Sequence, residues 1–521
     1  MADGSITLTI DGVPVSVPPG TLVIEAAKQA GVLVPHYCYH PGLSVAGVCR
    51  MCLVHVEKQP KLAIACATQV AEGMVVSTQH QDAKAARQGV LELLLINHPL
   101  DCPICDQAGE CELQDYVFQE GRAGTRYTEY AKRFNPVEDF GPDVLYVPNR
   151  CILCTRCVRF MEEVAQEPVL NVSERGDRAY IGIHPDVRLD HPWAGNVVDL
   201  CPVGSLLSKD FLHKARAWEL DKAASVCTGC SQGCNVTLDL RDQTVVRVRP
   251  RPNLEVNRYF MCDHGRATYR ALNRGDRIEA PLVRHGAELR AVDWDEALAR
   301  MRTLLQDARG SAVTIASPRA STEALFLARR LCARLDWSGA FQVVMGEEAP
   351  LAGVPNLALR AERAPNAAAA TLLGYTRDID RVLTAAQSAA LVLVVDESTL
   401  AVPTTGALLY AGTALPESAR HAAVVLPLAS MAEEDGTYVN RDGRVQRYFQ
   451  AKPAPGMARP AWWALGALVA VLEGGEAAGS AAEVFDQLAA TVDAFAGLTY
   501  GNLGMTGKLV GPAAAKAGVP A

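Results

Sequence analysis

The sequence has few of the features that mark three large classes of protein. It carries 50 lysines and arginines against 58 aspartates and glutamates, so its net charge is −8 and no basic excess is available to bind nucleic acid. The start, Met1 to Gly4, has neither the basic residues nor the apolar stretch of a secretory signal. The longest apolar run, 461–472, contains Gly466 and falls short of the roughly 20 residues of a membrane span, so it predicts a buried helix. We therefore expect a soluble cytoplasmic protein whose membrane contact comes only through partners.

Cysteine is almost absent from the second half of the chain. Of the 16 cysteines, only Cys332 lies beyond Cys262, and the other 15 lie between Cys38 and Cys262. The cytosol keeps thiols reduced, so clustered Cys-x-x-Cys pairs indicate metal sites rather than disulfides. A chain of 521 residues also exceeds what one hydrophobic core supports. We expect several domains, with the metal sites confined to the first half.

The opening of the chain predicts a small β-rich domain. Residues 5–10 and 13–17 alternate in polarity on either side of an Asp-Gly pair, which is typical of a β-hairpin, and Thr21 is placed to cap the helix that follows. A ferredoxin-like β-grasp domain fits this pattern and would end near Gln79. Residues 81–97 then predict a helix that stops before a proline.

The second half has a different pattern. Beyond Asp276, alanine-rich helical segments alternate with apolar runs such as 312–316 and 390–395, which favours an α/β domain. The end of the chain, 511–521, has little to bury, and we expect it to be disordered.

Four groups of cysteines have the spacing of cluster ligands. In chain order they are Cys38, Cys49, Cys52 and Cys66; Cys102, Cys105 and Cys111; Cys151, Cys154 and Cys157; and Cys227, Cys230, Cys234 and Cys262. Iron–sulfur clusters are held by four thiolates, and histidine replaces thiolate in some of them. The first and fourth groups are complete sets, and each of the other two needs one more ligand.

The two missing ligands are found in the sequence. His98 lies just before Cys102 and completes the second group, and a neutral imidazole there would raise the potential of the cluster. The third group opens like the bacterial four-iron motif, but Met161 stands where the fourth cysteine belongs. We assign Cys201, which precedes a proline and lies far along the chain, as the fourth ligand of that group. The alternative is that Cys201 is simply a buried cysteine. Zinc is the competing interpretation for the first two groups.

With these assignments, His98 and all 15 clustered cysteines are used. The count predicts one [2Fe-2S] cluster at the first group and three [4Fe-4S] clusters at the other groups.

Taken in order, the four groups resemble the large iron–sulfur subunit of respiratory complex I, the NADH:quinone oxidoreductase, over roughly the first 270 residues. The resemblance implies that electrons come from a flavin-bearing, NADH-binding subunit and enter at the Cys38 cluster. They would pass through the Cys151 and His98 clusters to a two-cluster ferredoxin-like subunit and the quinone-site subunits, while the complex couples this transfer to proton translocation. The fourth cluster would lie off this path. The chain would sit in the peripheral arm, on the cytoplasmic side of a bacterial inner membrane.

The C-terminal part resembles the molybdopterin-type domain of the same family at 423–427, 434–437 and 440–446. It has about half the customary catalytic length, and the helical pattern around Cys332 makes that residue part of the core rather than a molybdenum ligand. We expect an inert scaffold without molybdenum, flavin, NAD or a catalytic acid or base.

The expected fold is multidomain, α+β followed by α/β. Its parts are a [2Fe-2S] ferredoxin-like domain at 1–79, a His/Cys₃ [4Fe-4S] domain at 80–140, a [4Fe-4S] ferredoxin-like domain at 141–219, a molybdopterin-oxidoreductase-type [4Fe-4S] domain at 220–275, a shortened α/β domain at 276–510 and the tail at 511–521. Three other functions stay open. They are an NAD-linked formate dehydrogenase subunit, the electron-relay subunit of an NAD-reducing hydrogenase, and a zinc-bound assembly scaffold.

Overall fold

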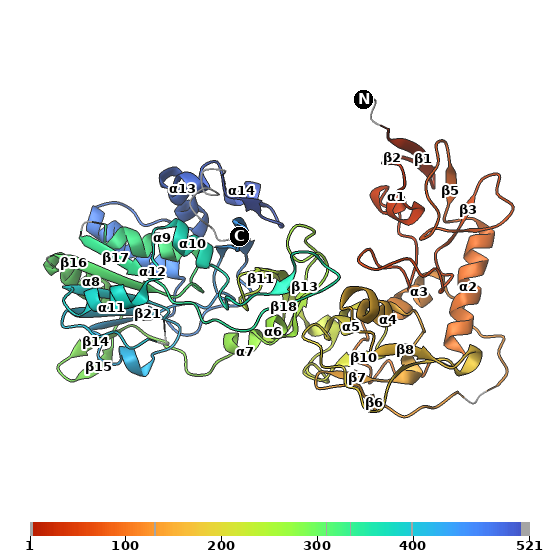
Figure 1. The fold of residues 1–521 in the computed structure, drawn as a ribbon, viewed down its shortest axis with the longest axis horizontal. Helices are drawn as coiled ribbons and strands as arrows, with labels where there is room; N and C mark the ends of the chain where they lie inside the picture. Colours follow the sequence, from red (N-terminus) through yellow and green to blue (C-terminus); the bar gives the residue numbers. More distant parts are fainter. Residues whose placement is uncertain (1–3, 130–131, 309, 334, 398–399, 512–521) are drawn as a thin grey trace. The chain divides into compact units, whose positions relative to one another are not determined.

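The chain folds into two compact units, seen in a computed structural model (Figure 1). The structure describes residues 4–129, 132–308, 310–333, 335–397 and 400–511. Unit 1 comprises Met1–Leu220 with Leu351–Pro355, and unit 2 comprises Asp221–Pro350 with Asn356–Ala521. Within the described ranges, every helix is too short or too polar to cross a membrane. Most of the tail, 512–521, lies outside the described residues.

Unit 1 begins with a five-stranded sheet of order β2-β1-β5-β3-β4. Its elements are β1 (Ile6–Ile10), β2 (Val13–Val17), α1 (Val23–Gln29), β3 (Leu53–Val56), β4 (Ala63–Ile64) and β5 (Val75–Ser77). The predicted hairpin is confirmed, and β5 lies parallel to β1. The expected cap at Thr21 is wrong. Leu22 is the N-cap, because the Thr21 hydroxyl donates instead to the Pro18 carbonyl at 2.7 Å.

The rest of unit 1 consists of short elements joined by loops. They are α2 (Gln81–Leu95), α3 (Glu112–Glu120), α4 (Arg156–Arg159), α5 (Asn196–Leu200), β6 (Glu138–Asp139), β7 (Val144–Tyr146), β8 (Leu170–Ser173), β9 (Tyr180–Ile183) and β10 (Leu206–Ser208), with a π-helix at Phe160–Val164 and 3₁₀ turns at Pro148–Arg150, Gly176–Arg178 and Ala217–Glu219. The helix expected over 81–97 is confirmed as α2, two residues shorter. A loop-rich fold is typical of a domain in which metal binding supplies folding energy.

Unit 2 begins with a three-stranded antiparallel sheet and two short helices. These are β11 (Asp221–Val226), β12 (Asn235–Arg241), β13 (Thr244–Pro250), α6 (Asp263–Arg266) and α7 (Tyr269–Leu272). The β11–β12 connection and the residue before α6 carry the fourth cysteine group, so this small sheet positions that group.

The main body of unit 2 is a seven-stranded sheet of order β15-β14-β22-β21-β20-β16-β17. The strands are β14 (Leu282–His285), β15 (Glu288–Ala291), β16 (Ser311–Ala316), β17 (Asp336–Ala340), β20 (Leu391–Val395), β21 (Ala407–Gly412) and β22 (Val424–Pro427). The five strands β16, β17, β20, β21 and β22 are parallel to one another. The strand β14 pairs with β22 in antiparallel register. The predicted α/β domain is confirmed, and two of its apolar runs form β16 and β20.

Helices cover both faces of this sheet. They are α8 (Trp294–Asp307), α9 (Thr322–Leu331), α10 (Ala367–Leu372), α11 (Ile379–Ala386), α12 (Ala461–Glu473), α13 (Ala481–Thr491) and α14 (Tyr500–Leu503). Leu391 and Leu393 of β20 pack into the core that contains α8, α9, α12 and α13, while Val392 and Val394 pack toward α11. A strand buried on both sides needs a continuous apolar run, which explains the sequence of β20. The buried helix expected from 461–472 is α12.

Small pairings complete unit 2. They are β18 (Ala349–Pro350) with β19 (Ala358–Leu359), the sheet of β23 (Gly436–Val439), β24 (Arg444–Tyr448) and β25 (Lys508–Leu509), and 3₁₀ turns at Glu417–Ala419 and Asp493–Phe495.

Candidate metal centres

The first cysteine group lies in the loop before β3 and in the turn after β4. The Cys38 thiol is within hydrogen-bonding reach of Cys49 and Cys66, and Cys52 is within reach of Cys66, so the structure brings the four side chains together. All but Cys49 are fully buried. Gly47 and Arg50 both have positive φ, at 64° and 57°, which curls the loop tightly around this site.

The second group forms a cavity with His98. His98, Cys102, Cys105 and Cys111 line it together with Arg150 and Gly204. Burial lowers the pKa of His98 to about 4, so the imidazole is neutral at physiological pH and can bind a metal. Cys111 is the N-cap of α3, and burial raises the pKa of its thiol to about 11, so the proton is lost when a metal binds. Cys102 is the exposed member of this set of candidate ligands.

Gly204 fits closely against this second site. A methyl group at Gly204 would lie 2.2 Å from Sγ of Cys105, well inside contact distance. A side chain here would occupy space beside the Cys105 sulfur that a bound cluster would need. Gly204 could not be singled out from the sequence, because nothing in the local sequence indicates that it lies against Cys105.

We expect Gly204→Ala to remove the second cluster while leaving the others in place, because the added carbon must displace Cys105 or the backbone, at a cost of about 1–3 kcal/mol. Iron content and the paramagnetic resonance spectrum of the reduced protein would measure this. Gly89→Ala in α2 is the matched control, since nothing lies within 4 Å of the added carbon. A Gly204→Ala protein with a full second-cluster signal would contradict the assignment.

The third group meets its remote partner. Cys151, Cys154, Cys157 and Cys201 line a single cavity, with Cys201 contributed by the end of α5. Burial raises the pKa of Cys154 to about 12, so its thiol stays protonated until a metal displaces the proton. Leu153 N–H donates to Sγ of Cys151 at 3.4 Å. The structure therefore supplies the fourth thiol that the local motif lacks.

The fourth group is buried in unit 2. Burial, and after it the charges of Cys227, Cys230 and Cys262, raise the pKa of the Cys234 thiol. Gly265 lies between two of them, because a methyl group there would be 3.0 Å from Sγ of Cys227 and 3.5 Å from Sγ of Cys262. The backbone N–H of Gly265 donates to Cys262 at 3.4 Å.

Residues of the C-terminal α/β region hold the loop of this fourth site. Asn440 donates to the Gln232 carbonyl at 3.3 Å, and Gln446 donates to the Gly233 carbonyl at 2.8 Å. The Arg360 guanidinium donates to the side-chain oxygen of Gln232 at 2.7 Å. The segment 440–446, which resembles a molybdopterin-type motif, thus supports a cysteine loop in this chain.

Two features of the structure fit iron–sulfur clusters at these sites. Glycines leave room beside candidate ligand sulfurs at the second and fourth sites, and backbone N–H groups donate to sulfur at the third and fourth. Among the described residues, no three His, Cys, Asp or Glu side chains converge as ligands of one metal ion would. Cluster ligands bind separate irons and so surround a larger volume.

Cys332 lies apart from the four groups. It is the C-cap of α9, has no exposed surface and contacts the Thr314 hydroxyl at 3.7 Å within the core of unit 2. The structure thus places it where the sequence predicted, in the core.

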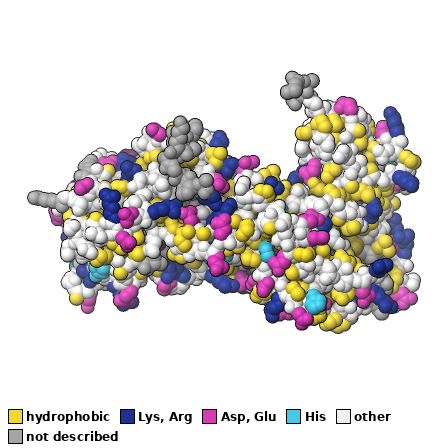
Figure 2. Space-filling model, viewed as in Figure 1, with side chains coloured by type: hydrophobic (Ala, Val, Ile, Leu, Met, Phe, Trp, Pro, Cys, Tyr) yellow, Lys and Arg dark blue, Asp and Glu magenta, His cyan; other side chains and the backbone are white. Residues whose placement is uncertain are grey.

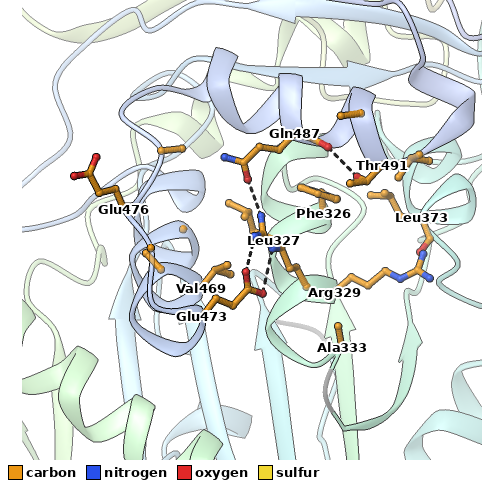
Figure 3. Close-up of a pocket in the computed structure, with 17 residues that line it drawn as sticks. Phe326, Leu327, Arg329, Ala333, Leu373, Val469, Glu473, Glu476, Gln487 and Thr491 are labelled. Atoms are coloured by element: carbon orange, nitrogen blue, oxygen red, sulfur yellow. Dashed lines mark hydrogen bonds and ion pairs between the residues drawn. The ribbon is translucent and has the colours of Figure 1, made fainter.

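Unit 2 also has a cavity of about 780 Å³ between α9, α12 and α13 (Figure 3). Its lining is mostly apolar. Arg330 crosses it and binds Glu473 at 2.5 Å and Gln487 at 2.6 Å, so these polar groups satisfy one another. No clustered cysteine lines this cavity, and we assign it no part in electron transfer.

Four thiol-rich sites on loop-rich supports define an iron–sulfur protein, and comparison with known proteins shows the same class. Family models match in chain order a 2Fe-2S iron-sulfur cluster binding domain at 3–81, an NADH-ubiquinone oxidoreductase-G iron-sulfur binding region at 87–126, an NADH-quinone oxidoreductase subunit 3 ferredoxin-like domain at 141–207, a molybdopterin oxidoreductase Fe4S4 domain at 220–274 and a molybdopterin oxidoreductase domain at 403–471. The chain therefore carries cluster domains of both the 2Fe-2S and 4Fe-4S kinds, and the predicted fold class is confirmed.

The relatives are components of one kind of enzyme complex. The G subunit of the NADH-quinone oxidoreductase of Rickettsia bellii is 42% identical over 323 residues, which cover 62% of this chain and 47% of the relative. The mitochondrial NADH-ubiquinone oxidoreductase 78 kDa subunit of Neurospora crassa is 46% identical over 294 residues, 56% of this chain and 39% of the relative. The chain is thus homologous to this bacterial protein and its mitochondrial counterpart, and it spans about half the length of these curated relatives.

One solved structure is more distant. A crystal structure of an NAD⁺-reducing [NiFe]-hydrogenase in the H₂-reduced state is 29% identical and covers 40% of this chain and 90% of its own, with a TM-score of 0.37.

Proposed function

We propose that the chain is the iron–sulfur electron-transfer subunit of an NADH:quinone oxidoreductase. It holds one [2Fe-2S] cluster at the Cys38 site and [4Fe-4S] clusters at the His98, Cys151 and Cys227 sites, each with the ligands assigned above. The observation that carries this proposal is the cavity in which His98 joins Cys102, Cys105 and Cys111. When bound, the clusters supply one-electron oxidation and reduction. The protein side chains fix the ligands, exclude water and donate hydrogen bonds to sulfur.

The exposure of the second site supports an exit for the electron. Cys102 is exposed, whereas the thiols of the first and third sites are buried or only partly exposed. A centre at the surface can exchange electrons with a partner. In line with the resemblance, electrons enter at the Cys38 cluster from a flavin-bearing, NADH-binding subunit and leave at the His98 cluster. The Cys227 cluster, in unit 2, lies off this path.

The surface around the second site fits a protein partner. Large apolar side chains are exposed over unit 1, and hydrophobic groups occur across its visible face (Figure 2). Leu100 is 87% exposed and Ile104 63% exposed, beside Cys102 in the chain. Trp218 is 68% exposed and lies against Gly109, and Arg216 ties this segment to the Cys105 carbonyl at 2.7 Å. Exposed Trp with Arg beside it is typical of an interface hot spot. We assign this surface to the two-cluster ferredoxin-like subunit that takes the electron.

We expect Trp218→Ala to weaken docking at this surface by about 2 kcal/mol, or roughly thirtyfold, because a large apolar anchor is lost. NADH:quinone activity of membranes that contain the complex would fall, while the cluster signals of the chain persist. Val172→Ala is the matched control, an apolar residue of unit 1 that is 45% exposed on β8. Equal activity in the two variants would exclude Trp218 from the interface.

The donor of the electrons tests the function as a whole. NADH is added anaerobically to membranes that contain the complex. We expect it to reduce the [2Fe-2S] cluster of this chain within the turnover time, so that the paramagnetic signal of the reduced cluster appears. Formate or hydrogen as the effective donor would instead support a formate dehydrogenase or hydrogenase relay. Reduction by neither NADH, formate nor hydrogen would remove the proposed role.

A further inference from the structure

Arg159 is a buried arginine that has no acidic partner in the described part of the chain. It ends α4, and only 7% of its surface is exposed. Its guanidinium donates to a hydroxyl and to backbone carbonyls, and none of these bonds is to an aspartate or a glutamate. Burying a charge without a counter-charge is costly, so buried arginines are normally paired. A counter-charge that belongs to a bound group would explain why this arginine lies inside the protein.

The contacts of Arg159 join two of the cysteine groups. Nη2 of Arg159 donates to the Cys38 carbonyl at 2.5 Å and to the Cys154 carbonyl at 3.4 Å. Nη1 donates to the carbonyl of Ser44, in the loop that carries the first group. Cys38 is an assigned ligand of the first site and Cys154 of the third, so a single guanidinium lies between the ligand loops of both sites.

The acidic residues near α4 are bound to other groups. Glu163, further along the chain, accepts hydrogen bonds from the Ser44 backbone N–H at 3.1 Å and from the Ser44 hydroxyl at 2.5 Å. Arg156, the other buried arginine of α4, shows the usual arrangement, because it binds the Glu112 carboxylate at 3.0 Å. The protein thus neutralises Arg156 and leaves Arg159 without a carboxylate of its own.

Bound clusters would supply the missing counter-charge. Iron–sulfur clusters with four thiolate ligands carry net negative charge, and one-electron reduction adds to it. A cation inside the protein is poorly screened by water, so it stabilises the reduced cluster more than the oxidised one. A cation beside a cluster therefore raises the reduction potential of that cluster.

We propose that Arg159 is a positioning residue shared by the first and third clusters. Its guanidinium holds the backbone of Cys38 and Cys154 in place, and its charge raises the reduction potentials of both clusters. The inference rests on the cluster assignments of the proposed function. Arg159 makes both clusters easier to reduce without itself binding iron.

Comparison of Arg159→Gln with Arg159→Lys tests the proposal. Glutamine removes the charge and lysine keeps it, while neither side chain reproduces the full set of guanidinium bonds. Redox titration of the intact complex is followed by low-temperature paramagnetic resonance. In the glutamine variant we expect the first and third clusters to shift about tenfold toward oxidation, which is 59 mV for one electron. The lysine variant should keep both potentials close to those of the unaltered complex.

Two controls separate the charge of Arg159 from other effects. Arg126→Gln removes an equal charge from the surface of unit 1, where the Arg126 side chain is 74% exposed, and should move neither potential. The second cluster is an internal control, since Arg159 makes no hydrogen bond to His98 or to the three cysteines assigned with it. Its potential should shift less than those of the first and third clusters.

Each result supports or overturns the proposal. Unchanged potentials in Arg159→Gln, a fall confined to one of the two clusters, or an equal fall in the lysine variant or in Arg126→Gln would overturn it. If glutamine prevents the first or third cluster from assembling, retention of both clusters by the lysine variant supports the need for the charge. Loss of a cluster in both variants would contradict the proposal, because the charge alone then does not suffice. NADH can still reduce the clusters when the potentials do not move, so failure of this inference is distinct from failure of the proposed function.

Discussion

Cys201→Ala is expected to remove the third cluster and about four of the roughly fourteen irons per chain. Three thiolates from Cys151, Cys154 and Cys157 would remain, and the cavity offers no other soft donor in place of the fourth. The loss should also break the path between the first and second clusters. NADH should then still reduce the [2Fe-2S] cluster, while quinone reduction falls to background. Iron analysis and NADH-reduced spectra of the complex would measure both effects.

Cys332→Ala is the matched control for this experiment. Cys332 is a fully buried cysteine in the core of unit 2, outside the four cysteine groups. Its removal should cost some stability and no iron. Retention of the third-cluster signal in Cys201→Ala would show that Cys201 is only a buried residue, as the open alternative holds.

His98→Cys is expected to keep the second cluster and to lower its potential. A fourth thiolate adds a negative charge where neutral imidazole now stands, and histidine ligation in other clusters goes with potentials that are higher by hundreds of millivolts. For the exchange of one imidazole for one thiolate, we expect the reduction potential of the second cluster to fall by on the order of 100 mV. This is about a fiftyfold shift of the redox equilibrium toward the oxidised cluster. The electron would then be harder to deliver to this cluster, and NADH:quinone turnover should slow.

His98→Ala separates ligation from simple packing. If His98 binds iron, alanine should cost the second cluster while cysteine retains it. If both variants keep the cluster at an unchanged potential, His98 is a helix-end residue and not a ligand. The redox titration of the intact complex distinguishes these results.

The candidate ligands could be predicted from the sequence because their chemistry is local. Cys-x-x-Cys pairs hold two sulfurs near one cluster whatever the rest of the fold does, and His98 lies within one short loop of its three thiols. Cys201 could be assigned only by elimination, since no local pattern joins it to Cys151. Its place in the cavity of the third site depends on α5, which the sequence did not single out.

The residues that pack around the sites could not be predicted from the sequence, because their contacts join parts of the chain that are far apart. Gly204 contacts Cys105 across about a hundred residues, and Arg360 donates to Gln232 in the loop of the fourth site across an even longer separation. Such contacts arise from tertiary packing, which composition does not encode.

In the second half, the apolar runs predicted the strands but not their order. The apolar run at 391–395 predicts a buried strand but does not predict its position in the sheet. The pairing of β20 with both β16 and β21 shows that this strand is an inner one. Thr21 illustrates a local error. Its hydroxyl could bond either to the N-terminus of the helix or to the preceding turn, and in the structure it donates to the Pro18 carbonyl of the turn.

The most direct test is the iron, sulfide, zinc and molybdenum content of the anaerobically purified chain, paired with low-temperature paramagnetic resonance during reduction. We predict about fourteen irons with matching sulfide, a [2Fe-2S] signal, and neither zinc nor molybdenum in stoichiometric amount. Zinc without sulfide would contradict electron transfer, and one molybdenum per chain would contradict the inert α/β domain.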